Sequence, residues 1–282
     1  RLMPGFWVCL AFCAFVLAPV MIAADHGAGA LASGATLADL ARYVVYNAAL
    51  VIFDPTIPRV LDGLDYRRVN PCLWTLAPEA ACYALLALAG LLGLLGVRRR
   101  IVLGVAFAAG LVLISGALAR VSPVLGDPAY IRLVELGMHF LGGVLTVLFL
   151  SRMPLTVTLA VALAVLYAFS IFFAPLQFLR VALLAPLIAA AGRVIPLHGL
   201  CDRTDVSYGL YLYGSAIQQF LVGSHWTAAG PWSFFALSFA ATLPLALMSW
   251  IAVERPMLSR WGRRSRAPDA YAGEERSAAG AG

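Results

Sequence analysis

Three glutamates and one histidine lie in or beside long apolar runs, where charged side chains are costly. Glu79 follows the stretch VNPCLWTLAP, Glu135 and His139 lie in a later run, and Glu254 ends the last one. A charge at the centre of a bilayer costs at least about 2.5 kcal/mol, so such residues usually face a polar cavity or a partner. For Glu79 two interpretations stay open: a structural acid, ion-paired or protonated, and a candidate catalytic acid lining a substrate-accessible cavity.

Glu135 and His139 are four residues apart in one apolar run, and the helical period therefore places them on one face. Contact with the carboxylate would fix the tautomer and the orientation of the imidazole, as general-base catalysis requires. The alternative is a hydrogen bond between helices near the membrane interface. Both residues are therefore secondary candidates for a catalytic pair.

The composition identifies the kind of protein in which these residues sit. Of the 282 residues, 62 % are hydrophobic and only 12 % are charged, whereas a soluble domain carries about a quarter charged residues. Only helices and closed barrels satisfy every backbone polar group in lipid. Because the apolar runs are continuous rather than alternating, the sequence predicts an all-α, polytopic membrane helix bundle.

About eight runs approach the roughly 20 apolar residues that a membrane helix needs. The predicted spans are Pro4–Ala24, Cys72–Val97, Ile101–Ala119, Tyr130–Leu150, Pro154–Ser170, Leu176–Gly192, Val206–Val222 and Trp232–Val253.

Arginine placement predicts the orientation of this bundle, because cytoplasmic loops carry an excess of basic residues. It favours two cytoplasmic termini and places the roughly neutral loop Asp25–Asn70 outside. Within that loop, Leu37–Ile52 has the spacing of an amphipathic helix. We expect residues 1–264 to form the membrane domain and 265–282 to be a disordered polar tail.

Cysteine pattern and charge exclude several other functions. The five cysteines form no C-x-x-C or Cys/His pattern, so free thiols and no metal site are expected. The net charge of +6 comes from arginines in loops and the tail, which is typical of membrane topology and does not indicate nucleic acid. A multi-pass transporter or a non-catalytic membrane scaffold remains an alternative to an enzyme, although no internal repeat supports the transporter.

Several stretches resemble the bacterial integral-membrane acyltransferase-3 family, which includes O-antigen, exopolysaccharide and Nod-factor O-acetyltransferases. VNPCLWTLAPEAACY is similar to the family's V-N-G-S-L-W-T-L-x-x-E-x-x-x-Y, with Pro71 and Cys72 in place of Gly-Ser. DVSYGLYLYGSAIQQ resembles D-x-S-Y-G-x-Y-L-Y-x-F-P-x-Q-Q, with Ser215 and Ala216 in place of Phe-Pro. SWIAVERP resembles S-x-x-x-x-E-x-P, and HFLGGVLTVLFLSRMPL resembles an F-x-x-G segment that closes on R-x-P-L. The matches keep family order over most of the chain.

The amino-terminal end departs from the family pattern. Family members begin with two further helices, the first carrying R-x(10)-H, whose His is the family's catalytic base. Arg1 and Pro4 match only the end of the following R-x-x-R-[IL]-x-P motif. The resemblance therefore implies a truncated chain that lacks the family's catalytic His, and we expect it to be inactive when expressed as written.

The resemblance implies transfer of an acyl group, usually acetyl, from cytoplasmic acyl-CoA to a hydroxyl of a cell-surface carbohydrate or lipid-linked glycan. The enzyme would be integral to the bacterial inner membrane, in contact with membrane lipid, and would hold acyl-CoA as a co-substrate with no bound cofactor. By resemblance Arg1 would bind the CoA phosphates. Substrate contacts would come from Asn70, Trp74, Ser207 and Tyr208, although Ser207 fits helix capping with Asp205 equally well.

Overall fold

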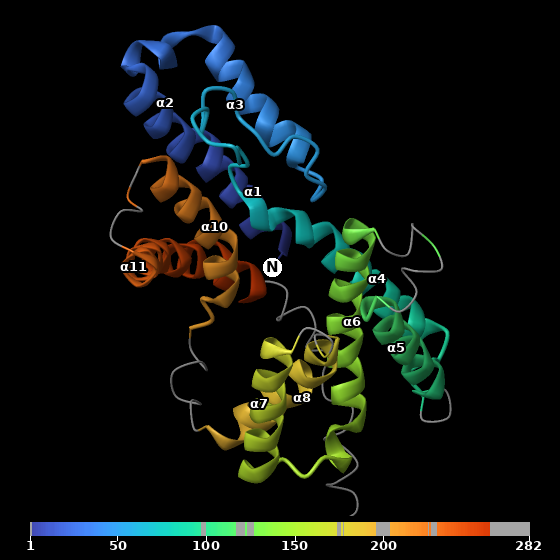
Figure 1. The fold of residues 1–282 in the computed structure, drawn as a ribbon. Coiled ribbons are helices and arrows are strands. Elements are labelled where there is room, and N and C mark those ends of the chain that lie inside the picture. The colour runs from blue at the N-terminus through green and yellow to red at the C-terminus, as the bar shows by residue number, and fades with distance from the viewer. Residues whose placement is uncertain are drawn as a thin grey trace, which may run out of the picture. The chain divides into compact units, whose positions relative to one another are not determined.

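The computed structural model describes residues 2–96, 100–116, 122, 127–173, 176, 178–195, 204–224, 226 and 230–259. Within these ranges every regular element is a helix, in agreement with the predicted class (Figure 1). Arg1 and the predicted tail 265–282 lie outside the described residues.

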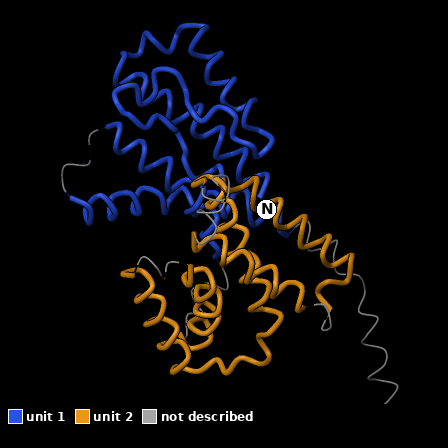
Figure 2. The backbone as a smooth tube through the Cα atoms, turned by 45° about the vertical axis from the view of Figure 1, so that its right-hand side comes forward, with its two compact units in different colours: residues 1–74, 204–282 blue, residues 75–203 orange. Residues whose placement is uncertain are grey.

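The chain forms two compact units, shown in separate colours in Figure 2. Unit 1 combines residues 1–74 with 204–282, and unit 2 comprises residues 75–203. Unit 1 therefore joins the two ends of the sequence, and unit 2 is the inserted middle.

The first apolar run of unit 1 is a continuous helix from Leu2 to His26. It consists of α1 (Leu2–Phe12), the π-helical segment η1 (Cys13–Leu17) and α2 (Ala18–His26). The other two long helices of the unit are α10 (Ser207–Gly223) and α11 (Pro231–Ser249), which continues into the π-helical η6 (Trp250–Glu254). Apolar side chains such as Phe6, Leu10 and Leu212 are fully buried between them.

A short helix and an ordered loop complete unit 1. The 3₁₀ segment η2 (Ala28–Ala32) precedes α3 (Gly34–Asn47), and the hydroxyl of Ser33 caps α3 by accepting from the amide of Thr36 at 3.2 Å. The amphipathic helix predicted over Leu37–Ile52 is therefore present but ends at Asn47. Its last residue anchors the loop: the Asn47 amide donates to the carbonyl of Asp54 at 2.7 Å and accepts from the amide of Asp54 at 3.1 Å.

The buried face of α3 and two ion pairs hold this segment in place. Tyr43 is 2 % exposed, and its burial raises the pKa of the phenol well above the usual value. Arg42 pairs with Asp54 at 3.1 Å, and Arg59 pairs with Asp39 at 3.5 Å. The loop then enters the 3₁₀ segment η3 (Pro71–Thr75).

The described residues of unit 2 form five α-helices. They are α4 (Leu76–Leu91), α5 (Arg100–Ile114), α6 (Pro128–Phe149), α7 (Val157–Phe172) and α8 (Leu179–Val194), with the 3₁₀ turn η4 (Leu150–Arg152) after α6. Side-chain caps start two of them: Asp127 accepts from the amides of Ala129 and Tyr130 before α6, and Thr156 accepts from Leu159 before α7. Helix α6 is the centre of the unit, since α4, α5 and α8 all pack against it.

Each of the eight predicted spans coincides with a helix, but four of these helices are long and apolar enough to cross a membrane. They are Leu2–His26, Pro71–Leu91, Pro128–Arg152 and Pro231–Ser259. The helices Arg100–Ile114 and Val157–Phe172 are apolar but shorter. At 1.5 Å per residue, a 16-residue helix such as α7 rises about 24 Å, against a hydrocarbon core of about 30 Å. Eight spans and the orientation of the termini therefore remain predictions.

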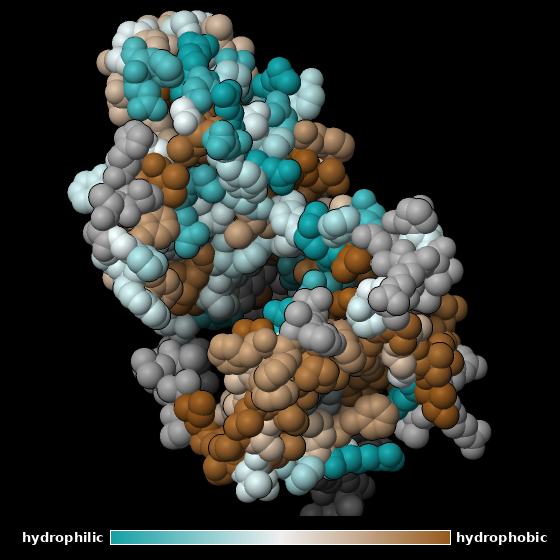
Figure 3. Space-filling model, in the orientation of Figure 1, coloured by the Kyte–Doolittle hydropathy of each residue, from teal (hydrophilic) through white to brown (hydrophobic). Residues whose placement is uncertain are grey.

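Both units leave apolar side chains on their surfaces, and in unit 1 these include Trp7, Phe15 and Trp232. In unit 2 many remain on the surface, and α7 alone exposes Val157, Val161, Val165, Leu166, Phe169 and Phe172. Figure 3 shows apolar residues covering the visible face of the α7 and α8 region, whereas the end of unit 1 that contains α3 is largely hydrophilic. Exposed apolar patches of this extent mark interaction or membrane surfaces, which agrees with membrane association of the protein.

Candidate functional site

Glu79 lies in the first turn of α4, where the helix dipole favours a negative charge. The hydroxyl of Tyr83, one turn later, donates a 2.7 Å hydrogen bond to Oε1 of Glu79. Tyr83 is 51 % exposed, and Glu79 is half-buried. The carboxylate therefore has one oxygen engaged by a phenol and a second oxygen that can accept from a ligand hydroxyl.

The helices that carry Glu79 and the pair Glu135 and His139 pack together within unit 2. The ring of Tyr83 on α4 meets the ring of Phe140 on α6 edge to face, with centroids 5.5 Å apart and planes inclined by 79°. Phe140 follows His139 directly in the chain. Through this contact, the sequence-predicted groups of α4 and α6 belong to one helix–helix interface.

The geometry of Glu135 and His139 differs from the expected carboxylate–imidazole contact. The hydrogen bond of His139 joins Nδ1 to the backbone carbonyl of Glu135 at 2.9 Å. Because a carbonyl oxygen can only accept, this bond requires the proton on Nδ1 and leaves the lone pair of a neutral ring on Nε2. His139 thus has the tautomer of a general base, and the group that sets this tautomer is the helix backbone rather than an acid.

His139 also lines an open cavity in unit 2, together with apolar residues of α4 and α6. The cavity has a volume of about 460 Å³, and its lining includes Leu86, Phe140 and Val147. The imidazole is the polar group of an otherwise apolar wall. Nearly all of the lining surface is apolar, so a ligand in this cavity would meet mainly hydrocarbon.

Asn70 of unit 1 is 4 % exposed, and its side chain is surrounded by other residues of unit 1. Its side-chain amide donates to the carbonyl of Leu212 on α10 at 2.8 Å and lies 3.5 Å from the sulfur of Cys9 on α1. Among the described residues, its Oδ1 is buried without a hydrogen-bond partner. These contacts join three segments of unit 1, and a role for Asn70 in binding substrate stays a prediction.

Trp74 has the exposure that a sugar-stacking residue needs. It is 39 % exposed in η3, and the neighbouring carbonyl of Cys72 accepts a 2.6 Å hydrogen bond from the hydroxyl of Tyr211. That bond ties η3 to α10. A role for Trp74 in binding substrate stays a prediction.

Ser207 and Tyr208 have partners within unit 1. The carboxylate of Asp205 accepts from the amide of Ser207 at 3.2 Å and from its hydroxyl at 2.5 Å, an arrangement typical of the start of a helix. The hydroxyl of Tyr208 donates to the carbonyl of Leu2 at 2.6 Å. The structure therefore favours local helix stabilisation for Ser207 and packing against α1 for Tyr208.

Sequence reasoning missed two features of the candidate groups. Tyr83 was part of a motif, but its spacing of four residues from Glu79 was the signal that it would contact the carboxylate. Glu254 is fully buried, and the hydroxyl of Ser249 donates to its Oε1 at 3.1 Å. The position of Glu254 in a π-helical segment, a feature frequent at functional sites, could not be read from composition.

No metal site is seen in the part of the chain that the structure describes, where no three His, Cys, Asp or Glu side chains lie close enough to hold an ion. The four described cysteines, Cys9, Cys13, Cys72 and Cys82, are free thiols. Cys201 and Arg1 lie outside the described residues.

Comparison with known proteins yields a partial match. The chain is 34 % identical over 85 residues to Nodulation protein 10 of Rhizobium leguminosarum bv. viciae, a match that covers 30 % of this chain and 23 % of the relative. The matched segment therefore spans about a quarter of that relative's length. No protein-family model matches the chain. No solved structure matches it.

Proposed function

We propose that the protein is a membrane-bound O-acyltransferase that moves an acyl group, in the first place acetyl, from acyl-CoA to a hydroxyl of a cell-surface carbohydrate or lipid-linked glycan. The observation that carries the proposal is the interface of α4 and α6, where the Glu79–Tyr83 pair and His139 lie on helices joined by the Tyr83–Phe140 contact. The partial similarity to Nodulation protein 10 supports a relationship to nodulation-type acyltransferases.

The transfer needs a proton acceptor and a group that positions the acceptor alcohol. No residue of the sequence matches the family's catalytic His, so the proposal departs from the expected inactivity and assigns the role of base to His139. In the proposed step Nε2 of His139 takes the hydroxyl proton, the alcohol oxygen attacks the thioester carbonyl, and the carbon–sulfur bond breaks. The departing CoA thiolate then takes this proton from Nε2 of His139, which restores the neutral imidazole. The hydrogen bond from Nδ1 to the carbonyl of Glu135 keeps the imidazole in the tautomer that this role requires.

Glu79 and Tyr83 are proposed to orient the acceptor rather than to remove its proton. The carboxylate oxygen not engaged by Tyr83 can accept a hydrogen bond from a sugar hydroxyl. Holding the hydroxyl and the base in one fixed geometry would lower the entropic part of the barrier. By resemblance Arg1 is proposed to bind the CoA phosphates and Trp74 to stack on a sugar ring.

The proposal is tested in the native cells, because they produce the gene product at its natural length. Membranes from wild-type cells, from a deletion strain and from a strain carrying His139→Gln are incubated with acetyl-CoA labelled in the acetyl group. We expect label in surface carbohydrate from wild-type membranes and background label from the other two, with equal amounts of protein in the wild-type and His139→Gln strains.

Two results would redirect the interpretation. Equal label in wild-type and deletion membranes would mean that the protein transfers no acetyl group. That result would fit a transporter or a non-catalytic scaffold. Label that survives His139→Gln at normal protein abundance would keep the transferase but remove His139 as its base.

A further inference from the structure

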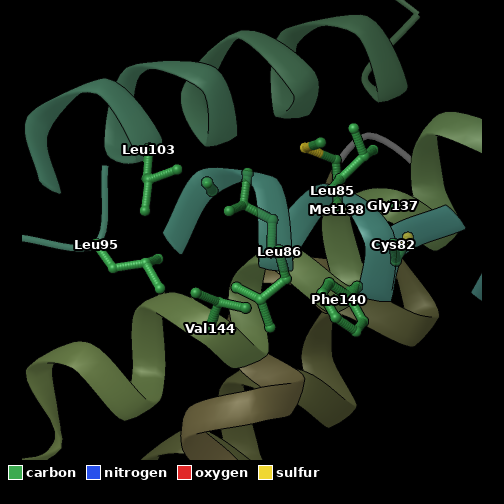
Figure 4. A pocket seen from close by; sticks show the side chains of 11 residues that line it. Cys82, Leu85, Leu86, Leu95, Leu103, Gly137, Met138, Phe140 and Val144 are labelled. Atoms are coloured by element: carbon green, nitrogen blue, oxygen red, sulfur yellow. The ribbon is translucent and has the colours of Figure 1, made fainter. Parts of the chain in front are cut away.

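A second cavity in unit 2 lies among α4, α5 and α6 and is lined by hydrocarbon. It has a volume of about 230 Å³. Figure 4 shows side chains from these helices converging on it, with Leu86, Leu103, Phe140 and Val144 around the space and the thiol of Cys82 as the one polar side-chain group. Apolar cavities stay dry, so a natural occupant would be a hydrocarbon group.

The volume fits a chain of moderate length. An engineered apolar cavity of about 150 Å³ binds benzene, which has six carbons. In proportion, the cavity in unit 2 would take about nine carbon atoms. That is more than an acetyl group and less than a full-length phospholipid tail.

A polar pair adjoins this cavity on the same helix. Cys82, in the cavity wall, is three residues after Glu79, so the two side chains share one face of α4. Phe140 lines the cavity on one side and contacts the ring of Tyr83 on the other. The Glu79–Tyr83 hydrogen bond therefore lies about one turn from the apolar wall.

The apolar cavity and the nearby Glu79 carboxylate together limit which head group a bound amphiphile can carry. A chain seated in the cavity would bring its head group to the Glu79 carboxylate, which accepts hydrogen bonds from hydroxyls. A phosphate in that position would bring negative charge against the carboxylate in a poorly screened environment, which is unfavourable. The surroundings therefore favour a neutral, hydroxyl-bearing head over an anionic one.

We propose that the cavity of α4, α5 and α6 binds the alkyl chain of a neutral, hydroxyl-bearing amphiphile from the membrane, with a head-group hydroxyl bound to Glu79. The site does not depend on the acyl-transfer reaction, since binding alone requires only the cavity and the carboxylate. It would also serve that reaction, by holding a lipid-linked hydroxyl at the α4–α6 interface.

The test measures how fast Cys82 reacts with N-ethylmaleimide. The full chain, with Cys82 as its only cysteine, is reconstituted in phosphatidylcholine nanodiscs. Bound monodecanoylglycerol covers the thiol and should slow the reaction by the factor 1 + [L]/Kd, which is about tenfold at about ten times the Kd. Lysophosphatidic acid with the same chain and monobutanoylglycerol should leave the rate near its starting value.

Three variants test where the amphiphile is bound. A chain whose only cysteine is Cys72, in unit 1, should show no protection. Leu86→Trp fills the cavity and should abolish protection of Cys82. Glu79→Gln keeps the cavity but removes the charge, so lysophosphatidic acid should now protect Cys82 as well as the neutral lipid does.

The outcomes separate specific binding from filling by any lipid chain. Equal protection of Cys82 by the neutral and the anionic amphiphile in the parent protein would mean that bilayer chains enter without selection, and the proposal would be wrong. Absence of protection, or equal protection of Cys72, would also overturn it. Because Glu79→Gln makes no change in the cavity, its result stands even if Leu86→Trp fails to fold.

Discussion

The hydroxyl of Tyr83 donates to Oε1 of Glu79 across 2.7 Å, one turn apart on α4. A phenol donor satisfies one carboxylate oxygen but is not a counter-ion, so this contact alone is not an ion pair. The pair also lies in a helix long and apolar enough to cross a membrane, Pro71–Leu91. This relationship leads directly to the first prediction.

Glu79→Gln should reduce acyl transfer by on the order of 100-fold at unchanged protein abundance, because the carboxylate that orients the acceptor is lost while size is kept. Tyr83→Phe should have a smaller effect in the same direction, since it removes only the donor to Oε1. Turnover and membrane abundance are measured together. Scarce protein would indicate a broken buried ion pair, whereas normal abundance with normal turnover would remove Glu79 from the site.

Glu135→Gln should leave turnover within about threefold of the parent, because His139 is held by the backbone carbonyl of Glu135, which any residue supplies. His139→Gln in the same background should abolish transfer. Labelled acetyl transfer checks both. A loss in Glu135→Gln as large as in His139→Gln would mean that the carboxylate, and not the carbonyl, orients the imidazole.

Asn70→Ala should lower the free energy of unfolding of unit 1 by roughly 1–3 kcal/mol, because the buried carbonyl of Leu212 loses its amide donor. The thermal midpoint in detergent, followed by aggregation, should fall. Gln218→Ala on the exposed side of α10 is the control and should keep the parent midpoint. An unchanged midpoint for Asn70→Ala would show that the Asn70–Leu212 bond does not hold η3 to α10.

Gly209→Ala should destabilise the packing of α10 on α11, because a Cβ at residue 209 would lie 2.7 Å from Cα of Ala246, a backbone atom that cannot rotate away. Overpacking of this kind costs about 1–3 kcal/mol. At Gly214 the nearest atom would be 4.0 Å away, on Thr242, so Gly214→Ala should be neutral or stabilising through its helix propensity. Thermal midpoints compare the two, and equal midpoints would contradict the close approach.

Topology is testable at Ala35, an exposed residue of α3. Ser33 is the less suitable position, because its hydroxyl caps α3. If the loop Asp25–Asn70 faces outward, Ala35→Cys in a chain without other cysteines should react with a membrane-impermeant maleimide in intact cells. Labelling only after lysis would reverse the predicted orientation.

Sequence reasoning anticipated the helices better than the contacts. All eight predicted spans contain a helix because apolar length is a local property of the chain. The predicted lengths were too generous for segments such as Ile101–Ala119, where the helix ends at Ile114 and Gly116 takes a φ of +74°. A hydropathy pattern continues through such a turn, since glycine and its apolar neighbours carry no polar signal.

The sequence by itself determined the all-helical class, the membrane character and the positions of the rare ionisable groups Glu79, Glu135 and His139, because these follow from residue type and spacing along a single segment. Only the tertiary structure decided what those and the other candidate residues touch. Asn70 reaches Leu212, 142 residues away, and Tyr208 reaches Leu2, 206 residues away. A hydrogen bond depends on atoms meeting within about 3 Å, and packing between distant segments, not periodicity, brings such atoms together.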